Sequence, residues 1–528
     1  MKRVLFIAIA TLLVATSMAR PRLVVNVVVS GMRHGDIVRY EKNLSKEGFL
    51  RLRDEGVEFT ECYANYAPTT SEAGLATFAT GALPATHGIF SSVGFDRTSG
   101  KEVKLCHSPK PEMVGIVRSD VEHDKTTQPF MAPTLSESVL DFSEGNRAIT
   151  IAHNPLSAMI VAGRKGESYW LNDRGQWMSA ECYMKELPSW VRSYNASDMN
   201  RVFAADSWYG RYTRDRYRNS RATDITIYED SKRPRSGRKL SKDWASGLRT
   251  MPSGNIAIFE FAKRALTTLL PLHVDGGAKV LNICLDVPRA VAERYGSDSI
   301  EYEDMLYSLD ATLAEFLTFL YAQMPSREDV VVVLTSDGGM SPTRVENNDS
   351  ARFNARQFGV IVNAFLSARY GQDSWVLGYT DGSLYLDHDV IYRHKKSIAE
   401  IQNETATFAL QYRGVVAAVT ATALRSAQFS RGAFALVQNG YNPRRSGDVM
   451  LVFDVDRIEL DAKRVAMSGS IYNYDRHIPL IISGGGVQPG ENSLRISSEQ
   501  IAPTLAAMMG VERPQCSDSE ILTIERRK

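Results

Sequence analysis

Few cysteines, almost no net charge and a single long apolar run narrow the classes of protein open to this chain. Its five cysteines are spread over 528 residues without a CxxC pair, which argues against a zinc site built from thiolates. Because the count is odd, one or two disulfides could form in an oxidising compartment, but at least one thiol would stay unpaired. The formal net charge of +1 gives no global field that would steer the protein toward nucleic acid or an anionic membrane.

The long apolar run lies at the N-terminus. A basic Met-Lys-Arg start precedes the apolar residues 4–15, and small residues in 17–19 fit a signal-peptidase site. A membrane anchor is the alternative, but the run is short for a bilayer span. We therefore expect residues 1–19 to be a signal peptide and the mature chain to begin near Arg20. The protein would then be periplasmic or secreted, with no membrane span after cleavage.

Six apolar, β-branched runs alternate with helix-like segments along the rest of the chain. The runs are expected to be strands buried on both faces, at 23–30, 147–154, 279–286, 329–336, 447–454 and 478–485. Helices are expected at 71–81, 299–324 and 497–510. In the last of these, Ser497 and Gln500 have the spacing of a capping box, and Gly510 ends the helix. Cys284 falls within one of the strands and is expected to be a small core residue.

This alternation predicts an α/β fold, an α/β/α sandwich with a largely parallel central sheet and surface insertions. Residues 20–528 are expected to form a single domain. In such folds, functional groups gather at the carboxyl ends of the strands.

One segment, about 207–244, is rich in arginine, lysine and tyrosine. Basic residues interleaved with aromatics can bind single-stranded nucleic acid or another polyanion. Acidic residues lie among them, however, and no nucleic-acid motif accompanies the charge. We favour a solvated surface insertion and expect no specific nucleic-acid binding.

Nine segments, taken in order, resemble the alkaline phosphatase superfamily, and most closely the secreted PafA-like phosphatases of Bacteroidetes. They are LVVNVVVSGMR, NYAPTTSEAG, LPATHGI, MPSGNIAIFEFAKRAL, YGSDSIEYEDMLYSLD, VVVLTSDGG, NPRRSGDVMLVF, YNYDRHIPLIISGGG and IAPTLAAMMG. The resemblance covers nearly the whole mature chain. It implies an alkaline-phosphatase-type sandwich and, in active members, hydrolysis of phosphate esters by two zinc ions and a threonine or serine nucleophile. Two close cations suit this chemistry because they clamp the attacking and leaving oxygens.

The resemblance also implies six metal-ligand positions, three aspartates and three histidines in active members. Of these ligands, this chain keeps only the aspartate of "SDGG". The six positions hold Ser30, Arg289, Glu293, Asp337, Gly338 and Ser468. A neutral hydroxyl is a poor zinc ligand, and a guanidinium cannot deprotonate and repels a dication. We therefore predict no bound metal and no other cofactor.

The nucleophile position implied by the resemblance is Ser71, at the expected start of a helix. A helix N-terminus favours a phosphate, so an active nucleophile is one interpretation. The interpretation we favour is a vestigial position, with Ser71 as an N-cap and Glu72 complementing the helix dipole.

The substrate-binding groups of active relatives are also replaced. Their lysine and arginine correspond to Asn154 and Leu156, and an asparagine corresponds to Ser91 or Ser92. Two histidines match landmarks of the family that we expect to be structural rather than ligating, His87 and His477.

These substitutions lead to a specific structural hypothesis. We expect Arg289 to pair with Asp337 or Glu293, so that a cation of the protein replaces the metal. The predicted function is that of a secreted, catalytically degenerate pseudo-phosphatase that acts by binding or assembly, with an unknown protein or an anionic ligand as its partner.

The alternative is a metal-dependent phosphomonoesterase or phosphodiesterase with Ser71 as the nucleophile. Zinc or another divalent cation would be needed only in this case. Its carboxylates would have to converge on an ion that prefers oxygen ligands, such as magnesium or calcium. The candidate carboxylates are Asp36, Asp286, Glu293 and Asp337.

Overall fold

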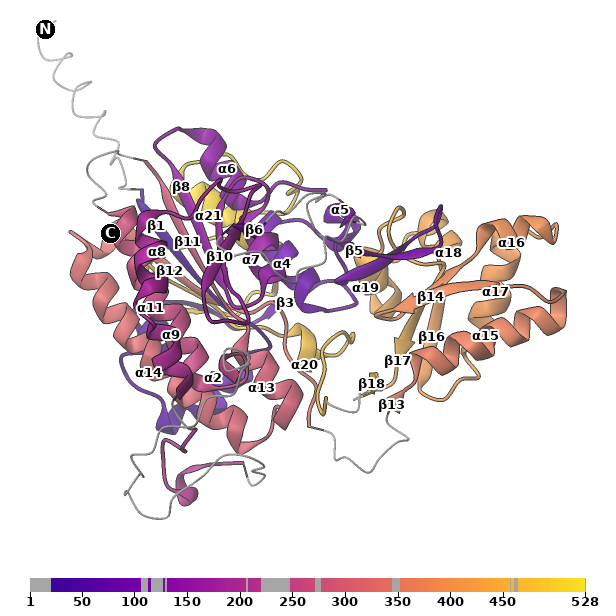
Figure 1. The fold of residues 1–528 in the computed structure, drawn as a ribbon, viewed down its shortest axis with the longest axis horizontal. Helices are drawn as coiled ribbons and strands as arrows, with labels where there is room; N and C mark the ends of the chain where they lie inside the picture. Colours follow the sequence, from indigo (N-terminus) through magenta and orange to yellow (C-terminus); the bar gives the residue numbers. More distant parts are fainter. Residues whose placement is uncertain are drawn as a thin grey trace, which may run out of the picture.

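The computed structural model describes residues 20–105, 113–114, 127–128, 131–205, 208–219, 247–270, 277–343, 352–455, 457–459 and 464–527. The predicted signal peptide lies outside these residues. Figure 1 shows a larger lobe around a central sheet and a smaller lobe to its right, built mainly from the orange part of the chain. In the described part of the chain, no helix is both long enough and apolar enough to cross a membrane.

A ten-stranded sheet forms the centre of the larger lobe. Its middle strands, β8, β11, β1 and β12, are parallel, whereas β19 runs antiparallel to β12. The expected largely parallel sheet is therefore confirmed. In spatial order the strands are β20 (Gly490–Asn492), β2 (Gly56–Phe59), β19 (Leu480–Gly484), β12 (Val330–Thr335), β1 (Leu23–Val29), β11 (Lys279–Leu285), β8 (Arg147–Ala152), β9 (Glu167–Leu171), β10 (Trp177–Ala180) and β6 (Met113–Val114).

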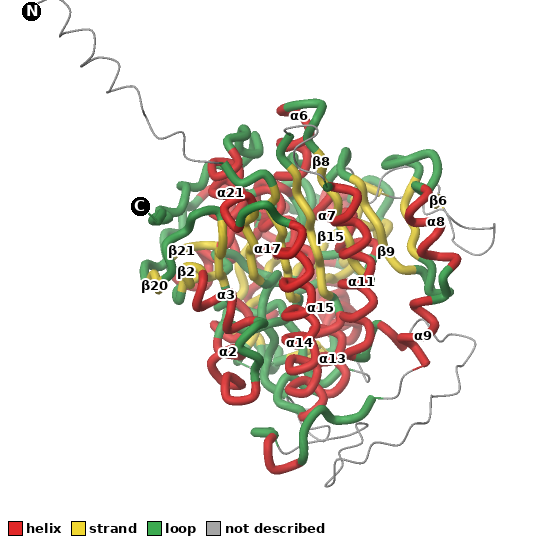
Figure 2. The backbone as a smooth tube through the Cα atoms, turned by 90° about the vertical axis from the view of Figure 1, so that its left-hand side faces the viewer, coloured by secondary structure: helices red, strands yellow, loops and turns green. Residues whose placement is uncertain are grey.

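Side chains alternate between two hydrophobic cores across this sheet, as the pleat of a strand requires. On β1 the odd-numbered residues 23–29 face one core, while Val24 and Val28 face the other. Figure 2 shows helices flanking the strands. The first core is covered by α3 (Phe49–Glu55), α8 (Ser189–Ala196), α11 (Pro252–Leu269), α13 (Val287–Tyr295) and α14 (Ile300–Gln323), and the second by α4 (Ser71–Thr80), α6 (Leu135–Phe142), α7 (Pro155–Ala162) and α21 (Ile501–Met509).

The expected helices are present, and their ends follow the sequence signals. Ser299 caps α14 by accepting from the backbone N–H of Tyr302. The capping box of Ser497 and Gln500 is confirmed, although it opens a short 3₁₀ turn ahead of α21. Gly510 ends α21 with a φ of +68°, which glycine adopts without strain.

One strand prediction needs correction. Residues 447–454 form β17 (Val449–Phe453), which does not join the central sheet. It is antiparallel to both neighbours in a four-stranded sheet of the smaller lobe. An apolar run shows that a strand is buried but does not show which sheet it joins.

The smaller lobe has its own hydrophobic core, packed between that sheet and its helices. The sheet is completed by β14 (Val376–Thr380), β15 (Ser383–Leu386) and β16 (Val415–Thr420), and the helices are α15 (Ala355–Tyr370), α16 (His388–Arg393), α17 (Ile398–Ala409), α18 (Ala421–Ser426) and α19 (Gly432–Gly440). The remaining short elements are α2 (Gly35–Tyr40), α5 (Pro84–His87), α9 (Met199–Ala205), α20 (Asn473–Arg476), β3 (Cys62–Tyr63), β4 (Val93–Asp96), β5 (Lys101–Leu105), β7 (Thr127–Gln128), β13 (Arg352–Phe353), β18 (Ile458–Glu459) and β21 (Ile496–Ser497).

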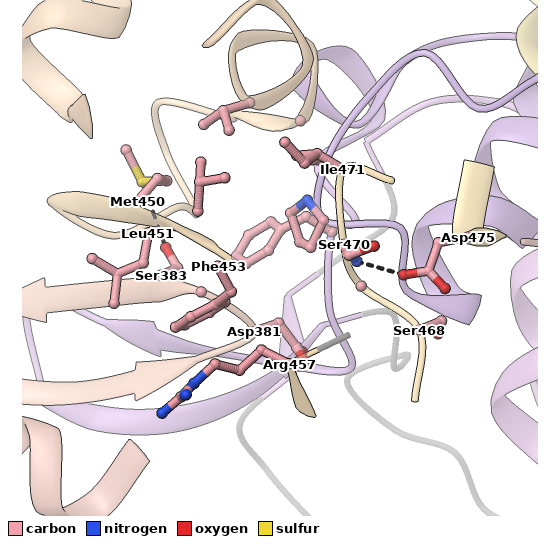
Figure 3. Close-up of a pocket in the computed structure, with 18 of the residues that line it drawn as sticks. Asp381, Ser383, Met450, Leu451, Phe453, Arg457, Ser468, Ser470, Ile471 and Asp475 are labelled. Atoms are coloured by element: carbon pink, nitrogen blue, oxygen red, sulfur yellow. Dashed lines mark hydrogen bonds between the residues drawn. The ribbon is translucent and has the colours of Figure 1, made fainter. Parts of the chain in front are cut away.

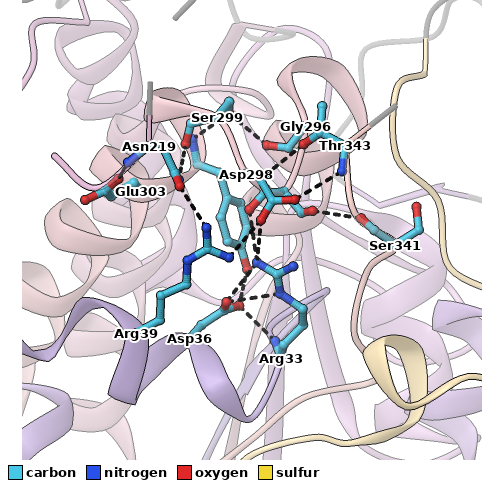
Figure 4. Close-up of polar contacts among 12 residues, drawn as sticks. Arg33, Asp36, Arg39, Asn219, Gly296, Asp298, Ser299, Glu303, Ser341 and Thr343 are labelled. Carbon is cyan, nitrogen blue, oxygen red and sulfur yellow. Dashed lines mark hydrogen bonds and ion pairs between the residues drawn. The ribbon is translucent and has the colours of Figure 1, made fainter. Parts of the chain in front are cut away.

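The described part of the basic insertion, residues 208–219, is held against α14. Trp208 and Tyr217 both donate to the carboxylate of Asp304, at 2.8 and 2.5 Å. Figure 4 shows Asn219 between Arg39 and Glu303, and its backbone N–H donates to Glu303 at 2.8 Å. The aromatic side chains of this part therefore serve packing. Residues 220–246 lie outside the described chain, so the prediction on polyanion binding stays open.

Cysteine placement agrees with the expectation for the core. Cys284 is buried with 1% of its surface exposed. Four cysteines are unpaired in the described chain, Cys62, Cys182, Cys284 and Cys516. Cys106 lies outside the described residues.

Candidate functional site: a guanidinium at the strand ends

Three neighbouring parallel strands end at the same edge of the central sheet. Val29 of β1 pairs with Leu285 of β11, and Val28 pairs with Thr335 of β12. The residues that follow these strands must therefore lie side by side. They include three of the positions singled out from the sequence, namely Ser30, Arg289 in the following helix α13, and Asp337.

Arg289 is the hub of this site. Its Nε donates to Ser30 Oγ at 2.8 Å, Nη1 to Ser468 Oγ at 2.5 Å and Nη2 to Asp337 Oδ1 at 3.0 Å. One planar guanidinium thus contacts residues at three of the other family metal-ligand positions. The expected pairing of Arg289 with Asp337 is confirmed.

The charges of this cluster are buried. The Asp337 side chain has 0% and the Arg289 side chain 12% of its surface exposed. Burial alone would lower the pKa of Arg289, but the carboxylates of Asp337 and Glu293 outweigh it and hold that pKa above its usual value. Asp337 also accepts from Ser30 Oγ at 2.5 Å and from the backbone N–H of Gly31 at 3.0 Å. The buried pair is therefore well supplied with hydrogen bonds.

Ser71 joins the same cluster, but not as the expected N-cap. The cap of α4 is Thr70, whose hydroxyl accepts from the backbone N–H of Ala73. Ser71 is the first helical residue, and its hydroxyl donates to Asp337 and lies 3.4 Å from that of Ser30. The sequence misplaced the cap because two hydroxyl residues stand together at the start of this helix.

Backbone conformation also separates this site from a metal centre. Gly338, at a family histidine position, has a φ of +149°, a conformation that L side chains rarely adopt. A histidine at this position would therefore meet backbone strain.

The residues present do not fit the two-zinc centre that the resemblance implies. The hydroxyls of Ser30 and Ser468 are taken up by Arg289, and Gly338 offers no side chain. Within the described residues, no group of three or more His, Cys, Asp or Glu side chains is arranged to hold a metal ion.

The carboxylates named for an oxygen-ligated metal are held in separate contacts. Asp36 accepts from Arg33 and Tyr302 (Figure 4). Asp286 accepts from the Ser157 hydroxyl and from the backbone N–H groups of His153 and Asn154, which directly precede α7. Glu293 lies 3.6 Å from the guanidinium of Arg464. The structure therefore does not bring these three together with Asp337 around one point.

The residues at the substrate-binding positions implied by the resemblance lie at or near the site, and none of them is basic. Asn154 caps α7 by accepting from the N–H of Leu156 at 3.0 Å, and both residues line the cleft in front of Ser71. Ser91 donates to Asp381, whereas Ser92 lines the cleft.

Both landmark histidines are structural, as expected. His87 is fully buried between the hydroxyl of Thr77 and the N–H of Ile89, and burial lowers its pKa to about 3. His477 bonds the carbonyl of Thr60 at 2.8 Å and stacks between His34 and Tyr63.

Sequence reasoning missed Asp381, which reaches the cleft from the smaller lobe. It occupies the turn between β14 and β15 with a φ of +40° and is followed by Gly382 at +79°. The Asp-Gly pair is a strong hairpin signal, so the turn could have been recognised. Its position opposite Ser71 depends on how the two lobes pack.

Comparisons with known proteins agree with this architecture. The family model described as type I phosphodiesterase / nucleotide pyrophosphatase matches residues 24–457. Alkaline phosphatase PhoV of Synechococcus elongatus is 27% identical, across 96% of this chain and 93% of its own length. Alkaline phosphatase PafA of Elizabethkingia meningoseptica is 25% identical, across 94% of this chain and 92% of its own.

The crystal structure of wild-type PafA superposes on 96% of this chain and 99% of its own with a TM-score of 0.84, at 23% identity. At that level of identity the match establishes the fold. The expected alkaline-phosphatase-like sandwich is thereby confirmed. Together, the matched length and the shared fold show that the chain belongs to the type I phosphodiesterase / nucleotide pyrophosphatase family of the alkaline phosphatase superfamily, with a PafA-like fold.

Proposed function

We propose that this protein is a catalytically degenerate member of its family that acts by binding rather than by metal-dependent phosphoryl transfer. The observation that carries the proposal is the Arg289 guanidinium, hydrogen-bonded to Ser30, Asp337 and Ser468. A fixed cation placed there satisfies the retained aspartate and repels a dication. The relatives named as alkaline phosphatases raise the question of activity for this chain but do not answer it.

The test is metal content and turnover measured on one sample of purified mature protein. We expect substoichiometric zinc, magnesium and calcium by elemental analysis. Hydrolysis of p-nitrophenyl phosphate and of its bis-ester should stay at background with each metal added. Near-stoichiometric metal, with turnover abolished by Ser71→Ala, would instead establish the phosphatase alternative.

A variant with four of the family's metal ligands restored tests whether the residues of this site exclude metal. Combining Ser30→Asp, Arg289→Asp, Glu293→His and Ser468→His restores four ligands of the family pattern and removes the competing cation. We expect this variant to bind zinc more tightly than the wild type in a competition titration with a chelator. Equal zinc affinity in the two proteins would show that Arg289 is not what keeps metal out.

We further infer that the protein acts outside the cytoplasm, in the periplasm or after secretion. The basic, apolar and small-residue pattern of residues 1–19 supports this proposal. Expression with its native N-terminus in a Gram-negative host, followed by N-terminal sequencing of the periplasmic fraction, should give Arg20 as the first residue. Recovery of uncleaved protein from the membrane fraction would favour an anchor.

A further inference from the structure

Two neighbouring cavities that share lining residues adjoin the Arg289 cluster. The first, here called the acidic cleft, has a volume of about 640 Å³ and lies in front of Ser71 and Arg289. The second, here called the inter-lobe chamber, has a volume of about 80 Å³ and lies where the two lobes meet. Asp381, Met467 and Ser468 line both cavities, so a ligand in one would border the other.

The acidic cleft has more carboxylates than it can neutralise internally. Each of its three arginines already has a carboxylate partner. Arg289 bonds Asp337, Arg464 lies 3.6 Å from Glu293, and Arg249 lies 3.1 Å from Asp173.

Three other carboxylates line the cleft without an ion pair to any described residue, Glu72, Asp286 and Asp381. Asp286 and Asp381 accept hydrogen bonds from neutral donors, chiefly Ser157 and Ser91. Burial raises the pKa of all three above its usual value. Burial is the largest cause in each case, and it favours the neutral carboxyl unless a cation is bound nearby.

The inter-lobe chamber has a largely apolar wall. Phe90 and Ile471 line it from the larger lobe, and Phe353, Val437, Met450 and Phe453 line it from the smaller lobe. Figure 3 shows Ile471, Met450 and Phe453 among these side chains. A site for one water needs roughly 10–15 Å³ by this measure, so the chamber has room for a small apolar group.

A buried carboxylate oxygen in the inter-lobe chamber lacks a hydrogen-bond partner among the described residues. Asp475 lines the chamber with 1% of its surface exposed. One carboxylate oxygen accepts from the N–H of Ser470 at 2.8 Å, as Figure 3 shows, whereas the other has no hydrogen-bond partner in the described structure. Because a buried acceptor without a partner is costly, this oxygen is an independent indication that a donor belongs here.

We propose that the acidic cleft and the inter-lobe chamber together bind an organic cation. Its charged nitrogen lies where the two cavities meet, beside Asp381 and the unpartnered oxygen of Asp475, and its apolar group packs on the apolar wall of the chamber. The proposal rests on the proposed function, because a pair of dications in the site would reverse the charge of the cleft. It assigns the cleft a cation in place of the anion that the family resemblance suggested. An anion in the cleft would face Glu72, Asp286 and Asp381, while the three arginines that line the cleft are already paired with carboxylates.

Isothermal titration calorimetry on the metal-free mature protein tests this proposal with phenethylammonium as the probe. We expect phenethylammonium to bind at least about tenfold more tightly than its neutral isostere 2-phenylethanol, because only the amine compensates the carboxylates. Methylammonium, which lacks the ring, should bind more weakly than phenethylammonium. Phenyl phosphate should show no binding.

The variant Asp381→Asn removes one of the carboxyls that has no ion pair, with little change in shape. Asparagine tolerates the positive φ of this turn and keeps an acceptor for Ser91, so the fold should be retained. The affinity for phenethylammonium should fall about tenfold while that for 2-phenylethanol stays unchanged. The matched control is Asp173→Asn, which alters a cleft carboxylate that already has Arg249 as its partner and should change amine affinity much less.

Several outcomes would overturn the proposal. They are equal binding of amine and alcohol, binding of phenyl phosphate in preference to the amine, an unchanged affinity in Asp381→Asn, and no binding of phenethylammonium at millimolar concentration. Elemental analysis of the same sample distinguishes the two proposals. Bound metal contradicts the proposed function, whereas metal-free protein without amine binding contradicts only this inference.

Discussion

At the scale of single residues, the Arg289 guanidinium determines the charge and the hydrogen bonding of the site at the strand ends. A buried Asp337 without a cation would be strongly unfavourable, since an ionised carboxylate loses its hydration on burial. Arg289 supplies the charge, and Ser30 and Ser468 accept from the donors that Asp337 does not use. Ser30, Arg289 and Ser468 depend on one another for these hydrogen bonds, so replacing any one of them alone should lower the stability of the protein.

We predict that Arg289→Met lowers the free energy of unfolding by about 3–5 kcal/mol, because it leaves Asp337 buried and unpaired. The double variant Arg289→Met with Asp337→Asn should recover most of this loss, since no buried charge then remains. Urea unfolding followed by circular dichroism measures both.

Arg249→Met is the control for this prediction. Its side chain is 41% exposed and its partner Asp173 is 78% exposed, so the loss should stay within about 1 kcal/mol. A loss as small for Arg289→Met would mean that the buried pair contributes little.

At the scale of secondary-structure elements, the close packing of helix α4 on the loop after β12 brings Ser71 to Asp337. A Cβ at Gly74 would lie 1.7 Å from the carbonyl oxygen of Asp337. Only glycine allows this approach, and the approach in turn sets where the first turn of the helix lies relative to the Arg289 cluster.

Gly74→Ala should therefore destabilise the protein by about 1–3 kcal/mol, because the helix must move away from the loop. Gly359→Ala in α15 is the matched control. The nearest atom to its Cβ is 4.0 Å away, so the better helix propensity of alanine should leave stability unchanged or raise it by up to about 1 kcal/mol. Thermal unfolding of the two variants side by side tests the contrast. Equal shifts would contradict the packing argument.

A contact between α14 and the segment around the start of α3 should make the stability of the protein depend on pH. Asp310 of α14 accepts from the N–H of Ser45, in the loop before α3, and from that of Phe49, the first residue of α3, at 2.5 and 2.7 Å. Burial nevertheless raises the pKa of Asp310 to about 6 from an ordinary value of 3.8. An acid with a raised pKa contributes stability that is fully present below pH 3.8 and is lost as the pH rises through about 6.

We accordingly predict that the stability difference between wild type and Asp310→Asn changes with pH. The advantage of the wild type should shrink from pH 4 to pH 7, at up to about 1.4 kcal/mol per pH unit where the carboxyl titrates. Urea midpoints at four pH values measure it. A difference that stays constant over this range would show that the Asp310 carboxyl does not titrate abnormally.

At the scale of the whole molecule, the two lobes are joined by buried polar contacts as well as by chain connections. Arg97, in the hairpin between β4 and β5, donates to the buried carboxylate of Asp448 at 2.6 Å. Asp448 also accepts from His388 and Gln402 within the smaller lobe. This arrangement ties the hairpin to the smaller lobe next to the inter-lobe chamber.

Arg97→Ala should loosen this junction without unfolding the central sheet. We expect a loss of about 1–3 kcal/mol, the usual cost when a buried charged acceptor loses a partner. Amide hydrogen exchange should become faster in β4, β5 and β15 but stay slow in β1 and β11. Arg369→Ala, which breaks an exposed pair with Glu404, serves as the control and should leave both sets of amides unchanged. Faster exchange throughout the central sheet would contradict a local role.

The sequence by itself determined five strands of the central sheet and the helices α4, α14 and α21 that pack on it. Runs of apolar residues such as that of β1 indicate burial on both faces, and the capping box of Ser497 and Gln500 depends only on neighbouring residues. The identities of Arg289 and Asp337 also sufficed to predict that these two side chains pair. All of these signals are local or depend on residue type alone.

Only the tertiary structure decided how these residues meet. Ser30, Arg289, Asp337 and Ser468 follow different elements, and Arg289 reaches its three partners because parallel strands end at one edge of the sheet. The Thr70 cap, the separate sheet of β17 and the approach of Asp381 to the cleft depend likewise on packing between distant segments. Local patterns carry periodicity and burial, whereas the direction of a side chain toward a distant partner is fixed only when the lobes and layers pack.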